Sequence, residues 1–106
     1  MTRTSLKLDL PRNELVSFCE RWKVSELALF GSVLREDFRA DSDIDALATP
    51  APDARWTLFD LMHMQEELGQ LFGRKVDLVS RRGLETSRNY IRRAAILDTA
   101  RVVYAA

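Results

Sequence analysis

Three aspartates are the first candidates for a catalytic or metal-binding role. Asp43 and Asp45 are separated by one residue within residues 43–48, which have the pattern of a strand. Asp77 lies in a second such stretch, residues 75–80. Side chains alternate between the faces of a strand, so Asp43 and Asp45 leave the same face with Cα atoms about 6.5–7 Å apart. If the two strands adjoin, Asp77 joins them in one small volume, where the carboxylates repel unless a cation lies between them. Carboxylate oxygens suit Mg²⁺, and two such ions can stabilise both the attacking and the leaving oxygen of an in-line displacement.

The acidic segment also has interpretations other than a magnesium site. An Asp-x-Asp pair also fits a polar strand face that binds nothing, and the pair alone does not decide between the two. A calcium loop of the EF-hand type would need glycine at its sixth position and glutamate at its twelfth. Counting from Asp41, those positions hold Ala46 and Pro52, which excludes that loop.

A glycine–serine pair upstream suits a phosphate group. Gly31 and Ser32 follow the apolar residues 27–30 and precede a helical turn expected over residues 33–37. Glycine lets a ligand approach the backbone, the hydroxyl is a donor, and helix N-termini offer free amides. Arg35 lies three residues after Ser32, on the same side of such a turn. A Walker loop is excluded because no Gly-Lys-Ser/Thr sequence follows, and the pair alone also fits an ordinary turn.

The surrounding sequence predicts the elements that would position these residues. Apolar spacing indicates a helix over residues 11–22 and a longer one over residues 53–72, with Asp53 as N-cap and Gly73 as the stop. The apolar stripe of the longer helix would run through Trp56, Phe59, Met62 or His63, Glu66, Leu68, Leu71 and Phe72. A further helical region opens at Gly83. Strands are expected over residues 27–30, 43–48, 75–80 and 102–104, and residues 38–42 are expected to be irregular. The predicted class is α+β, a small mixed β-sheet with helices packed against it.

Composition limits what the chain could be. Its 106 residues predict a single domain over residues 1–106. The 16 basic residues balance the 16 acidic ones, so sequence-specific nucleic-acid binding is not expected. No apolar run is long enough for a membrane span, no secretory signal is evident, and the lone Cys19 cannot form an internal disulfide. We therefore expect a cytoplasmic protein without a membrane partner.

Charge is unevenly distributed along the chain. Acidic side chains outnumber basic ones between residues 31 and 50, and the reverse holds between residues 74 and 101. The asymmetry fits a cation site facing an anion site, and it equally fits two solvated faces of opposite sign.

Residues 30–45, FGSVLREDFRADSDID, together with residues 75–79, KVDLV, resemble the signature of the DNA polymerase β-like nucleotidyltransferase superfamily. The chain is most similar to the minimal nucleotidyltransferase (MNT) proteins, and the similarity extends over nearly its whole length. The resemblance implies a polymerase β-like nucleotidyltransferase fold.

The resemblance also implies a role for each matching residue. Gly31 and Ser32 would hold the β- and γ-phosphates of a nucleotide. Asp43 and Asp45 would ligate Mg²⁺, with two ions expected. Asp77 would complete the catalytic site and help to deprotonate the acceptor hydroxyl.

The implied reaction is attack of a hydroxyl on the α-phosphate of ATP, with loss of pyrophosphate. Arg35 is a motif position that would either contact phosphate or brace the loop. Larger relatives carry a second, helical domain for which this chain has no residues, so a partner is expected to supply part of the substrate platform. MNT proteins are often paired with a HEPN-domain RNase toxin and act as its antitoxin by transferring AMP to a toxin tyrosine. The resemblance therefore implies such a toxin–antitoxin pair.

Two alternatives stay open. The chain could be a binding module that neutralises a partner by contact alone, or a nucleotidyltransferase acting on a small molecule. The oligomeric state, homo- or hetero-oligomer, is open as well.

Overall fold

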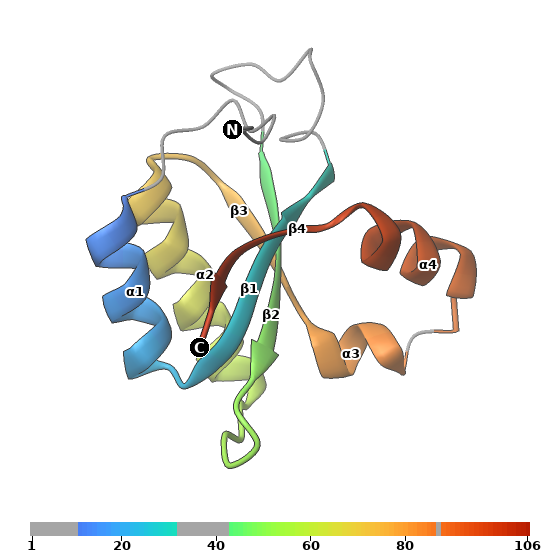
Figure 1. Cartoon of the computed structure of the whole chain (residues 1–106), viewed down its shortest axis with the longest axis horizontal. Helices are drawn as coiled ribbons and strands as arrows, with labels where there is room; N and C mark the ends of the chain where they lie inside the picture. The colour runs from blue at the N-terminus through green and yellow to red at the C-terminus, as the bar shows by residue number, and fades with distance from the viewer. Residues whose placement is uncertain (1–10, 32–42, 87) are drawn as a thin grey trace.

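A four-stranded mixed sheet is the centre of the fold (Figure 1). The computed structural model describes residues 11–31, 43–86 and 88–106. The strands lie in the order β3-β2-β1-β4; β2 and β3 are parallel, and the other two neighbouring pairs are antiparallel. Their bounds are β1 (Val24–Phe30), β2 (Ile44–Pro50), β3 (Val76–Ser80) and β4 (Arg101–Ala105).

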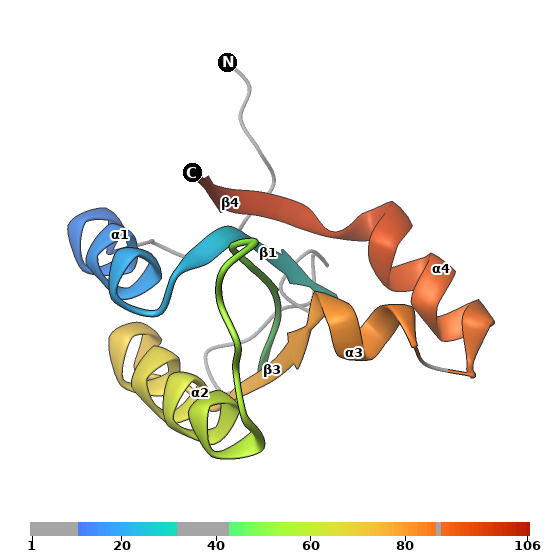
Figure 2. The same ribbon diagram turned by 90° about the horizontal axis from the view of Figure 1, so that it is seen from below.

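Helices cover both faces of this sheet, as the view along it in Figure 2 shows. One pair, α1 (Arg12–Arg21) and α2 (Leu58–Phe72), packs on one face, and a second pair, α3 (Arg81–Glu85) and α4 (Tyr90–Thr99), lies on the opposite side. The expected α+β class with a small mixed sheet is confirmed. None of the helices within the described ranges is long and apolar enough to cross a bilayer.

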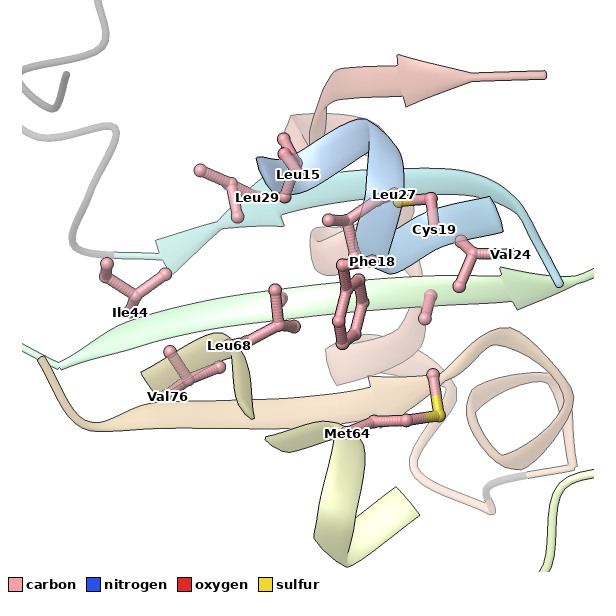
Figure 3. Packing of buried hydrophobic residues seen from close by; sticks show 12 residues of the cluster. Leu15, Phe18, Cys19, Val24, Leu27, Leu29, Ile44, Met64, Leu68 and Val76 are labelled. Atoms are coloured by element: carbon pink, nitrogen blue, oxygen red, sulfur yellow. The ribbon is translucent and has the colours of Figure 1, made fainter. Parts of the chain in front are cut away.

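The larger core, which we call the α1–α2 face, lies between the sheet and these two helices (Figure 3). Strand alternation directs Ile44, Ala46 and Ala48 of β2 toward it, as the sequence predicts. An irregularity in the pairing of β1 near its start lets both Val24 and Leu27 reach the same core despite their odd spacing. The remaining fully buried members are Leu15, Phe18, Cys19, Leu29, Met64, Leu68 and Val76.

A smaller core, the α3–α4 face, lies on the other side of the sheet. Ala28, Phe30 and Leu47 point into it from β1 and β2, and Leu84 of α3 and Ile96 of α4 cover them. The side chains that alternate with the first core along β2 and β3 belong to this face. Asp45 and Asp77 are among them.

The long helix begins later than the spacing predicts. The expected start over residues 53–72, with Asp53 as N-cap, is wrong: α2 is capped by Thr57, whose hydroxyl accepts from the Asp60 N–H at 3.1 Å while the Asp60 carboxylate accepts from the Thr57 N–H at 2.9 Å. This reciprocal pair satisfies two of the amides that a helix start leaves unbonded. Asp53 instead pairs with the Lys23 ammonium at 3.1 Å.

The buried stripe of α2 differs from the predicted one in the first half of the helix. Phe59 and Met62, expected to be buried, are 72% and 56% exposed, and Met64 is fully buried instead. The predicted burial of Leu68 is confirmed, and Leu71 and Phe72 pack against the same core. Trp56 lies ahead of the helix and donates its indole N–H to the Trp22 carbonyl at 2.8 Å. The stop at Gly73 is confirmed, since its φ of 67° is the left-handed conformation that glycine favours.

The C-terminal third forms two helices and a strand. Gly83 lies inside α3 instead of opening a single helical region, because the Ser80 hydroxyl caps the helix by accepting from the Gly83 N–H at 3.0 Å. The strand expected over residues 102–104 is confirmed as part of β4. The turn predicted over residues 33–37 and the irregular residues 38–42 lie outside the described residues.

Candidate active site

Two of the three predicted carboxylates come from directly paired positions of neighbouring strands. In the parallel pairing of β2 with β3, Asp45 is the Cα partner of Asp77. Neighbouring strands lie about 4.8 Å apart, and paired residues present their side chains to the same face. Asp45 is half-buried and Asp77 is exposed, so the pair is accessible from solvent. The adjacency that the sequence argument required is present.

Gly31 lies against the first of these carboxylates. Its φ of 78° is in the left-handed region, and Phe30 before it is the Cα partner of Asp45. A Cβ built on Gly31 would collide with Asp45 Oδ2. The position therefore excludes a side chain for two reasons, backbone conformation and space. This close approach of bare backbone to a carboxylate is the most specific feature of the site.

Asp43 stands one residue ahead of β2, not within the strand as expected. It is exposed. The start of β2 is tied to β3 by the Ile44 N–H, which donates to the Lys75 carbonyl at 2.9 Å. Continuing the strand alternation by one residue places Asp43 on the face of Asp45.

The carboxylates at this position suit a divalent metal by their chemistry, because carboxylate oxygens are the ligands that Mg²⁺ prefers. The absence of a side chain at Gly31 lets the Asp45 carboxylate pack directly against the backbone. As the side chains stand, no three or more His, Cys, Asp or Glu residues of the described ranges are grouped closely enough to hold a metal ion. The metal-binding roles of Asp43, Asp45 and Asp77 thus stay a prediction.

The remaining predicted site residues, Ser32 and Arg35, lie outside the described residues. Their roles in binding the nucleotide stay predictions too.

One contact beside the site was missed by sequence reasoning. The Gln65 side chain of α2 accepts a hydrogen bond through Oε1 from the Leu78 N–H at 2.8 Å, and Leu78 directly follows Asp77. A glutamine within a helix carries no sequence signal for this contact, because the contact depends on how the helix packs along the strand.

Part of the basic C-terminal third is neutralised within the fold. Arg81 forms ion pairs with Glu85 at 3.1 Å and with Glu26 at 3.9 Å. A groove of about 430 Å³ beside it is lined by both signs of charge, since Arg82 and Glu85 both contribute. For Arg81, intramolecular pairing is therefore the better interpretation than a dedicated anion site.

Comparison with known proteins agrees with this geometry. The profile of the family described as "Nucleotidyltransferase domain" matches residues 14–101. A protein of Methanocaldococcus jannaschii named "Putative protein adenylyltransferase MJ1217" is 35% identical over 65 residues, which are 61% of this chain and 64% of that relative. The match therefore spans less than two thirds of the relative's length.

Solved structures share the architecture. One described as "putative minimal nucleotidyltransferase" has a TM-score of 0.64 and 33% identity, with 85% of this chain and 86% of that chain covered. A toxin–antitoxin crystal structure with AMP-PNP gives a TM-score of 0.69 at 19% identity, covering 92% and 75%. A tri-AMPylated Shewanella oneidensis HEPN toxin in complex with an MNT antitoxin gives 0.57 at 18%, covering 89% and 69%. At these low identities the last two show the fold alone.

The fold and the profile match define the class: the chain belongs to the nucleotidyltransferase domain family. Within that class the chain belongs to the minimal nucleotidyltransferase family, because 33% identity extends over most of both chains.

Proposed function

We propose that this protein is a Mg²⁺-dependent adenylyltransferase that transfers AMP from ATP to a tyrosine of a HEPN-domain partner, whose toxicity it thereby neutralises. The observation that carries the proposal is Asp45 in register with Asp77 on parallel strands, with the bare backbone of Gly31 against Asp45. The names of two similar proteins support this more specific proposal. The M. jannaschii relative is named as a protein adenylyltransferase, and one structural neighbour contains a tri-AMPylated HEPN toxin.

The proposal assigns metal binding and phosphate binding to different residues. Asp43 and Asp45 would hold Mg²⁺, with Asp77 as the third carboxylate. Bound there, the metal would supply charge neutralisation for the triphosphate. The backbone of Gly31, next to Asp45, would approach the phosphates without a side chain in the way, and the hydroxyl of Ser32 and the guanidinium of Arg35 would be donors to them.

Asp77 is the general base in this proposal. The acceptor oxygen forms a bond to the α-phosphorus, the bond to the bridging oxygen of pyrophosphate breaks, and Asp77 accepts the hydroxyl proton. The exposed position of Asp77 at the sheet edge leaves it open to a macromolecular acceptor. Holding the two reactants in this geometry would supply much of the rate enhancement.

Intact mass of the partner tests the proposal. A HEPN-domain protein chosen as the candidate partner is incubated with this chain, ATP and Mg²⁺, and then weighed by mass spectrometry. We expect a gain of one or more AMP units with the natural chain. The gain should be lost with the Asp43→Asn, Asp45→Asn double variant and kept with Asp98→Asn, an exposed aspartate of α4.

Other outcomes separate the alternatives. A double variant that still neutralises the toxin would show that contact suffices. Modification of a small hydroxyl compound in place of the HEPN protein would show a small-molecule nucleotidyltransferase. Absence of any mass gain with all three aspartates intact would overturn the proposed transfer.

A further inference from the structure

The strand that carries Asp77 lies at an edge of the sheet. Among the described residues, the strand order is β3-β2-β1-β4, and β3 has a hydrogen-bonded partner strand, β2, on one side only. Successive amides of a strand point alternately to its two sides, so every second amide of an edge strand lacks a partner strand. Such an edge is free to shift or fray unless something else bonds to it. An aspartate carried there would shift with it.

A side chain from α2 takes the place of the missing strand. The Leu78 N–H points away from β2 and donates to Gln65 Oε1 at 2.8 Å. This amide belongs to the peptide unit that joins Asp77 to Leu78. Holding it fixes the plane of that peptide, and with it the backbone from which the Asp77 side chain projects.

The glutamine is itself firmly placed. Its neighbour Met64 is fully buried, and so is Leu68 one turn further along α2; both belong to the larger core. Gln65 is half-buried between these anchors and the strand edge. Because α2 is fixed in the core of the α1–α2 face, Gln65 holds the Asp77–Leu78 peptide of β3 in place. This peptide follows Asp77, the residue paired with Asp45.

We propose that Gln65 is a positioning residue for the active site: it holds β3 so that Asp77 stays opposite Asp45 at the separation that a shared metal requires. This inference rests on the proposed function, because it assumes that the two carboxylates act on one ion. Residues that orient metal ligands in this way typically change metal affinity or activity by about 10–100-fold when they are replaced. We expect Gln65→Met to weaken Mn²⁺ binding by about tenfold.

The variant series exploits a matched control on the same helix. Gln65→Met keeps the length of the side chain and removes the acceptor. Gln65→Glu keeps an acceptor at the same reach. Gln70→Met makes the same chemical change at an exposed position of α2.

Two readouts are independent of AMP transfer. The first is hydrogen exchange of the Leu78 amide by NMR, which should become faster in Gln65→Met and return toward the natural rate in Gln65→Glu. The second is Mn²⁺ binding by calorimetry, with a non-hydrolysable ATP analogue present and no protein partner. Gln65→Glu should bind Mn²⁺ far more tightly than Gln65→Met, and Gln70→Met should match the natural chain in both measurements.

The Mg²⁺ dependence of transfer then distinguishes positioning from mere stabilisation. Positioning predicts a higher half-saturating Mg²⁺ concentration in Gln65→Met, with the loss recovered by excess Mg²⁺. A lower melting temperature with unchanged metal affinity would overturn the inference and leave the proposed function intact. If the natural chain and Asp45→Asn bind Mn²⁺ equally, the proposed function fails and the inference fails with it.

Discussion

The two faces of the sheet differ in what they bury and in what they expose. On the α1–α2 face, two helices of ten and 15 residues cover a core whose members are almost all inaccessible to solvent. Burial there, with a smaller contribution from Glu20, raises the pKa of the Cys19 thiol to about 12. The α3–α4 face has a smaller buried cluster, and the same face carries Asp45 and Asp77.

The difference separates stability from chemistry within one sheet. Each residue of β2 and β3 serves one face or the other by simple alternation. Apolar side chains on one side hold the strands in register, and that register sets the carboxylates on the other side next to each other. Substitutions of the carboxylates should therefore lower activity and leave stability almost unchanged, whereas substitutions of buried apolar side chains should lower stability, most strongly on the α1–α2 face.

The largest expected effect is on activity. Asp45→Asn should lower AMP transfer by about 100- to 1,000-fold, as loss of an electrostatic contributor at a reacting phosphate does. The free energy of unfolding should change much less, because the side chain is only half-buried and Asn keeps its shape and size. Radiolabelled transfer assays and urea denaturation measure the two quantities. A large loss of both transfer activity and the free energy of unfolding would contradict the division of roles between the two faces.

Core truncations should show the reverse pattern. Leu68→Ala, at a residue 0% exposed in the larger core, should cost about 3–4 kcal/mol, toward the upper part of the range for such substitutions. Leu84→Ala on the α3–α4 face, at a residue 3% exposed, should cost about 2 kcal/mol because fewer side chains surround the cavity. Urea denaturation compares them. A larger cost for Leu84→Ala would contradict the ranking of the two cores.

Gly31→Ala should affect both quantities. The left-handed φ costs about 1–2 kcal/mol for a residue with a Cβ. The new methyl group would also displace the Asp45 carboxylate, so activity should fall more than stability alone explains. Measuring transfer well below the unfolding temperature separates the two effects. Full activity at that temperature would show that the position of Asp45 is not set by Gly31.

Trp56→Phe should have a smaller effect. It removes the hydrogen bond from the indole N–H to the Trp22 carbonyl while keeping most of the aromatic surface. The expected cost is about 1 kcal/mol, the net value of a typical hydrogen bond. Thermal unfolding followed by calorimetry checks it, and transfer activity should be unchanged at low temperature. Loss of activity there would link this loop to the site.

The smallest effect concerns pH. Arg21 donates to Glu67, and this hydrogen bond, together with one from the Trp22 indole N–H at 3.0 Å, lowers the pKa of Glu67 below its ordinary 4.5. A carboxylate with a lowered pKa stabilises the fold above its unfolded pKa and loses that contribution as pH falls through the folded value. The stability difference between the natural chain and Glu67→Gln should therefore shrink on acidification. A difference that grows instead would reverse the sign of the interaction.

Much of the fold could be predicted from local sequence pattern. The alternation of Ile44, Ala46 and Ala48, the apolar stripe of residues 11–22 and the stop at Gly73 each depend on neighbouring residues alone. The predicted start of α2 is wrong. Asp53 is a residue type that favours the N-cap position, but Thr57 and Asp60 form two reciprocal capping hydrogen bonds and so fix the start at Thr57. Asp53 instead bonds to Lys23, which lies 30 positions away in the sequence, and local pattern does not predict such a contact.

At the candidate site, the adjacency of Asp45 and Asp77 could be predicted from the sequence, whereas the contacts that support it could not. The spacing of Asp43, Asp45 and Asp77 indicated three carboxylates on strands, and the parallel pairing brings Asp45 next to Asp77. The bond from Leu78 to Gln65 depends on the packing of a helix along a sheet edge, which residue spacing does not encode.

The central claim is that carboxylates 45 and 77 act together on the α-phosphate of ATP. It is tested most directly by following label from ATP carrying ³²P at the α- or the γ-position. With the natural chain, α-label should be transferred to the HEPN partner and γ-label should leave as pyrophosphate. Asp45→Asn and Asp77→Asn should each lower the transfer of α-label by about 100- to 1,000-fold. Undiminished transfer by either variant, or γ-label on the partner, would contradict the claim.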